Sequence, residues 1–138
     1  MCSTRLTNAV VSTILVGSAP FGVAISPNGA RLYVTNLGSD SVSVIDTATN
    51  AVVATIPVGA GPWGVAVSPA GNHVYVSNTA EAPNGAPKEN TVSVIDTSTN
   101  VEVTTLPPVG QNPMGLVATA SHVYVAHAGS DLVSVIDV

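Results

Sequence analysis

Few side chains in this sequence could do chemistry, and they are scattered along it. Three histidines, one cysteine and eight acidic residues occur among 138 amino acids. His127 comes closest to a metal ligand or a general base, because it ends a short apolar segment that would hold it in place. Asn36 and Asn78 end two matching segments earlier in the chain, so a polar position at the end of a strand explains all three residues. We therefore predict no catalytic histidine.

The remaining polar patterns point to turns. Asp46, Asp96 and Asp137 each end the pentapeptide VSVID, and the first two lead into DTATN and DTSTN. An aspartate there can accept hydrogen bonds from backbone amides of the turn. No GxSxG, HExxH or CxxC motif is present, and a single cysteine excludes an internal disulfide. We predict no metal site and no cofactor.

Large side chains in three similar turns are better candidates, and for binding. The turns GSAPF, GAGPW and GQNPM end in Phe21, Trp63 and Met114. An aromatic ring such as Trp63 can stack on a sugar or another ring, and it can equally fill the joint between two packed sheets. Both interpretations stay open on the sequence alone.

One loop is longer than its counterparts. VSVID moves by 50 residues, from 42 to 92, while the preceding YV pair moves by 42, from 33 to 75. The eight extra residues lie in Thr79–Asn90, a stretch rich in Pro and Gly that contains Glu81, Lys88 and Glu89. Variable loops on a rigid scaffold often carry function. We count these three charged residues among the binding candidates.

The elements that hold these residues are repeated. The pentapeptide VSVID occurs three times. Each copy is preceded by one of the related tetrapeptides YVTN, YVSN and YVAH, and each tetrapeptide by one of the related segments PFGVAISPNG, PWGVAVSPAG and PMGLVATAS. A repeat of about 40 to 50 residues made of short apolar segments and turns is typical of a β-propeller blade. Inner strands rich in Gly and Ala, and second and third strands that are apolar throughout, favour wedge-shaped sheets stacked on one another.

We expect an all-β fold of three four-stranded antiparallel blades, with strands A (inner) to D (outer). The whole of residues 1–138 forms one domain, with blades at about 8–46, 47–96 and 97–138. The expected A strands are 21–26, 63–68 and 114–119; the B strands 31–36, 73–78 and 122–127; the C strands 41–46, 91–96 and 132–137; the D strands 8–17, 50–59 and 100–110. Strand 8–17 comes before the first A strand, so it would close another blade from outside.

This strand order predicts where a ligand would bind. In a propeller the D–A and B–C loops share one end of the blades, which we name the mouth face. The residues that we expect there as binding candidates are Phe21, Trp63, Met114, Asn36, Asn78, His127, Glu81, Lys88 and Glu89. The single observation behind this choice is that these loops differ in length and sequence while the strands do not.

Composition excludes several partners. Only 8% of residues are charged, against about 25% in typical globular proteins. Three scattered basic residues and a net charge of −5 offer no surface for nucleic acid. No apolar run approaches the roughly 18 residues of a membrane span. We also find no signal peptide before Asn8 in this chain, and expect a cytosolic protein or a mature, exported form.

The words YVTN, VSVIDTATN, VVATIPVG and PFGVAISPNG resemble the YVTN-type β-propeller repeat of surface-layer and other secreted or periplasmic proteins. The resemblance extends from Asn8 to Asp137. It implies a propeller fold and a secreted, periplasmic or cell-surface location. Relatives of this class include binding and adhesion modules with protein or glycan ligands. More distant propellers with lactonase or lyase activity supply the alternative, an enzyme with a site at the central channel.

Three blades are too few for a closed propeller, which needs about four to eight. Each open blade face would expose on the order of 400 Å², or roughly 10 kcal/mol of unburied apolar surface. We therefore expect a homodimer that closes a six-bladed ring, with each joint sealed by a swapped outer strand. A fragment of a longer propeller, for example a seven-bladed one, is the alternative, and three chains with nine blades a third. The expected function is that of a non-catalytic binding or scaffold module.

Overall fold

Eleven β-strands and no helix make up the part of the chain that the structure describes. The computed structural model describes residues 8–79, 90–106, 111–128 and 130–138. The strands are β1 (Pro20–Ile25), β2 (Arg31–Asn36), β3 (Ser41–Asp46), β4 (Ala51–Pro57), β5 (Pro62–Val67), β6 (His73–Asn78), β7 (Thr91–Asp96), β8 (Val101–Leu106), β9 (Pro113–Ala118), β10 (His122–His127) and β11 (Leu132–Asp137). The predicted second and third strands match these bounds, and the inner strands begin one residue earlier. No described helix is long and apolar enough to cross a membrane.

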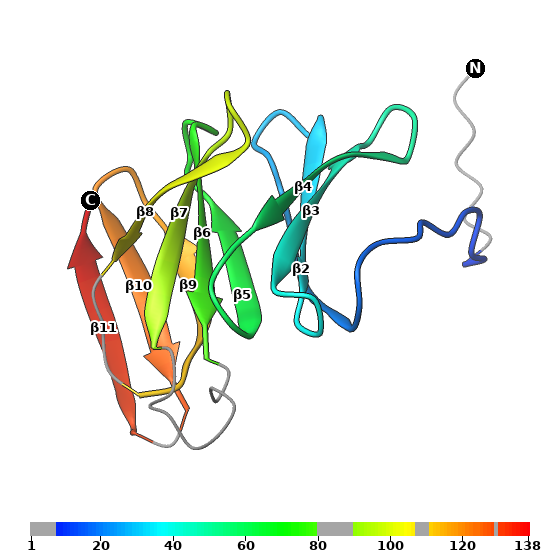
Figure 1. Cartoon of the computed structure of the whole chain (residues 1–138). Helices are drawn as coiled ribbons and strands as arrows, with labels where there is room; N and C mark the ends of the chain where they lie inside the picture. The colour runs from blue at the N-terminus through cyan, green and yellow to red at the C-terminus, as the bar shows by residue number, and fades with distance from the viewer. Residues whose placement is uncertain (1–7, 80–89, 107–110, 129) are drawn as a thin grey trace.

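The strands form three antiparallel sheets in chain order, as expected of propeller blades. Blade 1 is β1-β2-β3-β4, blade 2 is β5-β6-β7-β8, and blade 3 is β9-β10-β11. The inner strands β1, β5 and β9 lie next to one another, so the three sheets fan out from a common edge (Figure 1). The prediction of an all-β fold built from blades is confirmed.

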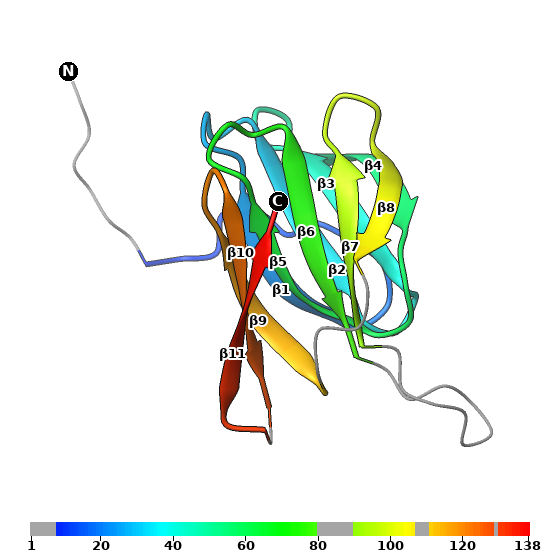
Figure 2. The ribbon, with the colours of Figure 1, turned by 90° about the vertical axis from the view of Figure 1, so that its left-hand side faces the viewer.

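Blade 3 differs from the expectation of four strands. In the single chain it has three, because residues 8–17 form no strand and pair with no sheet. They lead away from blade 1, on the opposite side of the molecule from β11 (Figures 1 and 2). The geometric reason is that blades 1 and 2 separate this segment from the free edge of β11. A strand formed by residues 8–17 against a second copy stays a prediction.

The core consists of two apolar layers, one between each pair of blades. Between blades 1 and 2, Tyr33, Val42, Val44 and Ile56 pack on Val74, Val76 and Ile95. Between blades 2 and 3, Tyr75, Val92 and Val94 pack on Leu116, Val123 and Val125. The strands β2, β3, β6 and β7 are buried on both faces, which explains why they are apolar at almost every position.

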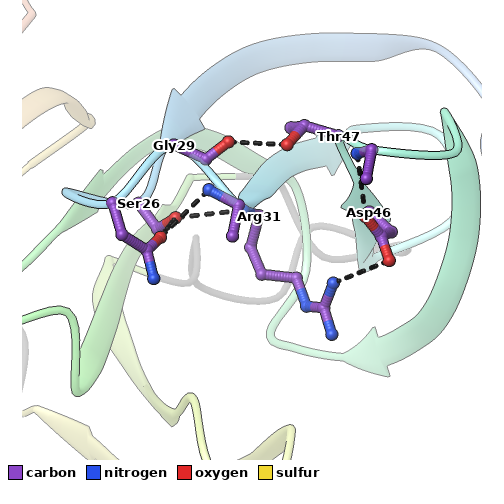
Figure 3. Close-up of polar contacts among 8 residues, drawn as sticks. Ser26, Gly29, Arg31, Asp46 and Thr47 are labelled. Atoms are coloured by element: carbon purple, nitrogen blue, oxygen red, sulfur yellow. Dashed lines mark hydrogen bonds and ion pairs between the residues drawn. The ribbon is translucent and has the colours of Figure 1, made fainter.

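The turns follow the chemistry read from the sequence. Gly29 adopts φ +75° in the SPNG turn, a conformation that glycine takes without strain. The side chain of Ser26 accepts a hydrogen bond from the Arg31 amide at 3.0 Å, and Asp46 accepts one from the Ala48 amide at 2.9 Å (Figure 3). These contacts stiffen the end of the blades opposite the mouth face.

Candidate functional site

The register of the sheets brings the predicted mouth-face residues to one end of the blades. Pro20 pairs with Asn36, Pro62 with Asn78 and Pro113 with His127. The first residues of the inner strands therefore lie beside the last residues of the second strands. Phe21, Trp63 and Met114 each follow directly after these prolines. Tertiary pairing thus gathers six of the nine candidates at one end of the molecule.

Phe21 and Trp63 form an aromatic pair across the joint between blades 1 and 2. Their ring centroids are 4.2 Å apart with an interplanar angle of 70°, an edge-to-face arrangement. Phe21 is 59% exposed, while Trp63 and Met114 are half-buried. Trp63 is thus partly covered at the joint between blades 1 and 2, and the pair offers an exposed aromatic edge. Stacking of the Trp63 ring on a ligand stays a prediction.

A bulge at the start of each inner strand holds these side chains in place. The pairing shifts between Pro20 and Val23 and, in the same way, between Pro62 and Val65. Such bulges reorient local side chains and often occur next to functional sites. Each bulge consists of the residue with the large side chain and the glycine that follows it, for example Phe21 and Gly22 in blade 1.

In blades 1 and 2, one hydroxyl group per blade links the bulge to the next blade. Thr35 accepts a hydrogen bond from the Gly22 amide at 2.8 Å and donates one to the Trp63 carbonyl at 2.8 Å. Ser77 accepts from the Gly64 amide at 2.9 Å and donates to the Met114 carbonyl at 2.5 Å. The backbone beneath the mouth residues of blades 2 and 3 is therefore fixed by the blade before it.

Sequence reasoning missed these two residues. Thr35 and Ser77 were visible as the third letters of YVTN and YVSN, and Ala126 stands at the same place in YVAH. The signal was a hydroxyl at one repeated position inside an apolar strand. It was overlooked because strand periodicity does not show that a side chain reaches across to another sheet.

Asn36, Asn78 and His127 are buried inside their own sheets. The Asn36 amide nitrogen donates to Ser41 and Ser43, and that of Asn78 donates to Thr91 and Ser93. His127 bonds through Nδ1 to the Gln111 carbonyl at 2.9 Å and through Nε2 to Ser134 Oγ at 2.7 Å. All three join the second strand to the loop or third strand beside it. Direct contact of these residues with a ligand stays a prediction.

The asparagines are also incompletely paired. The buried Oδ1 atoms of Asn36 and Asn78 have no hydrogen-bond partner among the residues that the structure describes. A buried acceptor without a partner costs about 1–3 kcal/mol. Glu81, Lys88 and Glu89, the remaining candidates, lie outside the described residues.

Most of the charged side chains that the structure describes lie at the end of the blades opposite the mouth face. Arg31 forms an ion pair with Asp46 at 3.2 Å (Figure 3), and His122 lies 3.9 Å from Asp137. Hydrogen bonding from the Ala48 amide, with a contribution from Arg31, lowers the pKa of Asp46 below its usual 3.8. The Ser98 hydroxyl and amide lower the pKa of Asp96 in the same way. The predicted turn-capping role of these two aspartates is confirmed.

A pocket of about 430 Å³ also lies away from the mouth, between blades 2 and 3. Its lining includes Ser68 and His73 from blade 2, Thr104 and Leu106 from β8, and Val138 after β11. Among the residues described, no three His, Cys, Asp or Glu side chains are grouped so that they could hold a metal ion.

Comparison with known proteins supports the fold. No protein-family model matches the sequence, and no curated protein matches it. Among solved structures, Kuenenia stuttgartiensis hydrazine synthase is similar with a TM-score of 0.76 and 29% identity, over 96% of this chain and 36% of that one.

Two further structures show the same arrangement at lower identity. The Myceliophteria thermophila Cps50 (Swd1) β-propeller domain matches with a TM-score of 0.72 and 12% identity, over 91% of this chain and 38% of that chain. A proposed 6-phosphogluconolactonase from Bacteroides fragilis matches with a TM-score of 0.75 and 19% identity, over 91% of this chain and 36% of that chain. The chain has a β-propeller fold and spans little more than a third of these structures.

Proposed function

We propose that this chain is a non-catalytic binding or scaffold module whose mouth face, the end with the D–A and B–C loops, carries the ligand site. The observation that supports it most directly is the Phe21–Trp63 pair, an exposed aromatic edge. It stands on a backbone that Thr35 holds from the neighbouring blade. Rigid aromatic side chains supply large contact area at little cost in conformational entropy. Such a site suits a glycan ring or an apolar side chain of a protein partner.

Trp63 makes the proposal testable, because it is the only tryptophan of the chain. Its fluorescence should change when the protein is titrated with soluble chitin or cellulose oligosaccharides, and the protein should be retained on purified peptidoglycan sacculi. Phe21→Ala keeps the reporter and should weaken binding by roughly 10- to 100-fold, the loss of one aromatic anchor.

His122→Ala, at the opposite end of blade 3, is the matched control and should bind like the original protein. Binding at full strength by the Phe21→Ala variant would place the ligand elsewhere. If neither oligosaccharide nor sacculi bind, the glycan is excluded as the ligand and a protein partner becomes the form of the proposal to test.

We propose further that two copies close a six-bladed ring. Support comes from the outer faces of blades 1 and 3, where Val23, Val117 and Val133 are 66%, 63% and 62% exposed. Their counterparts at the inner joints are covered by the neighbouring blade. Solution mass by light scattering tests this point, with about twice the 13.7 kDa of one chain expected. A mass of one chain would contradict it.

A lactonase- or lyase-like enzyme is the second candidate. The likeness to a proposed 6-phosphogluconolactonase favours it. His127 is the first side chain to test for such chemistry, because a histidine can act as a general base. Metal-dependent hydrolysis of 6-phosphogluconolactone, measured by acid release and lost in His127→Ala, would support this function over binding. The resemblance to YVTN-type repeats supports a secreted or cell-surface setting for either one.

A further inference from the structure

We propose that residues 8–17 of one copy form the outer strand of blade 3 of a second copy, and that the Phe21 carbonyl of the first copy, which supplies the strand, packs over Gly115 of the second. This inference rests on the proposed two-copy ring and specifies its joint. It follows from comparing the two joints inside the chain with the open faces at its ends.

The glycines of the inner strands provide the first argument. A Cβ on Gly22 would lie 2.6 Å from the Trp63 carbonyl oxygen, and one on Gly64 would lie closer still to the Met114 carbonyl oxygen. Each glycine is therefore required by the next blade. A Cβ on Gly115, at the same place in blade 3, would meet nothing within 4 Å. Its φ is not positive, so no contact among the described residues requires a glycine there.

The exposed face of blade 3 provides the second argument. Tyr33 and Tyr75 are 2% and 4% exposed, but the equivalent Tyr124 is 37% exposed. Val133 is 62% exposed where its equivalent Val42 is fully buried. Blade 1 lacks a covering blade on the face that points away from blade 2, since Val23 is 66% exposed there and the equivalent Leu116 is only 9% exposed. The faces that are open are the two that would form a third joint.

The missing outer strand provides the third argument. Ile56 on β4 is 1% exposed, whereas its equivalent Leu106 on β8 is half-buried and lines the pocket between blades 2 and 3. Blade 2 supplies an outer strand beside β4, but blade 3 supplies none beside β8. A strand on β11 would run along this side of the pocket and cover Leu106.

Residues 8–17 have the sequence for that place, and their first residue has the matching backbone conformation. NAVVSTILVG differs from NAVVATIPVG at 50–59 at only two positions. Asn8 has φ 53°, close to the 56° of Asn50 and the 55° of Asn100, which directly precede β4 and β8. Val10 and Val11 of the segment are 83% and 91% exposed in the single chain. The segment therefore has the sequence of a third outer strand but pairs with no sheet in the single chain.

A second copy is the occupant that these features select. The segment and the free edge of β11 lie at opposite ends of one molecule (Figure 1). Two copies related by a twofold axis can satisfy both needs at once, because each provides one segment and one free edge. Four blade faces of about 400 Å² each would bury about 1,600 Å² in total, the size of a standard stable interface.

Register gives the sharpest test. Val42 pairs with Ile56 in blade 1, so Val133 should pair with Ile14 of the second copy. On a Cys2→Ser background, oxidation of Ile14→Cys/Val133→Cys should give a covalent dimer on a non-reducing gel. Ile14→Cys/Val135→Cys is the matched control, because Val44, the equivalent of Val135, pairs with Ala54 instead, and it should cross-link at least tenfold less.

Gly115→Ala supplies an independent readout. The variant should fold normally, with an unchanged circular dichroism spectrum, because the single chain has room for the methyl group. Overpacking at the joint should raise the dimer dissociation constant by roughly 10- to 100-fold. This joint would be overturned if Gly115→Ala left the dimer intact and residues 14 and 133 failed to cross-link. The proposal of a two-copy ring would still stand in that case. A monomeric original protein would overturn both.

Discussion

Removal of the Thr35 hydroxyl tests whether the cross-blade bridges hold the propeller together. Thr35→Val keeps the shape of the side chain and deletes one oxygen. That oxygen serves the Gly22 amide and the Trp63 carbonyl, both at 2.8 Å, in a fully buried side chain. The Gly22 amide and the Trp63 carbonyl would each lose a hydrogen-bond partner, at a cost of about 1–3 kcal/mol per group. Because water can reach these groups in part, we expect the free energy of unfolding to fall by about 2–4 kcal/mol.

Urea denaturation followed by circular dichroism measures this loss. At a slope of about 1–3 kcal/mol per M, the midpoint should fall by roughly 1–2 M with the slope unchanged. Protein concentration must be held constant, since association would add to apparent stability. Thr47→Val is the matched control, because the Thr47 hydroxyl makes a single exposed bond, to the Gly29 carbonyl at 2.6 Å. Thr47→Val should lower the free energy of unfolding by about 1 kcal/mol or less. Equal effects of the two substitutions would refute the reasoning.

Three further outcomes follow from the same structure. Ala19 has φ 51° at a turn position where Gly61 stands in the next repeat, so Ala19→Gly should stabilise the protein by about 0.5–1 kcal/mol in thermal unfolding. Gly64→Ala, in contrast to Gly115→Ala, should cost at least about 2 kcal/mol and yield poorly folded protein by circular dichroism, because the Met114 carbonyl occupies the space of the new methyl group. The lowered pKa values of Asp46 and Asp96 stabilise the fold above pH 3.8, so stability should fall as the pH drops through those values, and Asp46→Asn should reduce this acid dependence.

Much of the fold could be read from the sequence because its signals are local. Each strand lies between turn residues that act within a few positions, such as the proline and glycine of SPNG or the aspartate of DTATN. The three repeats then confirm one another, since the same local signal occurs at the same place each time. The failure of residues 8–17 to form a strand in the single chain has the opposite origin: a strand needs an edge to pair with, and no local signal supplies one.

The candidate site was predicted less completely. The repeat order placed Phe21 and Trp63 at one end of the blades, and the structure brings their rings together. It also places His127 inside its sheet, 2.7 Å from Ser134, where the sequence suggested a polar strand end. The bridge from Thr35 to Trp63 could not be foreseen, because it joins positions 28 residues apart through the packing of two sheets.

The sequence by itself determined the kind of fold and the conformation of its turns, since identical words such as VSVID carry identical local preferences. Only the tertiary structure decided what each copy of a word does. Val42 and Val133 occupy the same place in that word, yet one is fully buried and the other is 62% exposed. Burial depends on the neighbour that covers a residue, and the neighbour of blade 3 does not follow from the residues of blade 3.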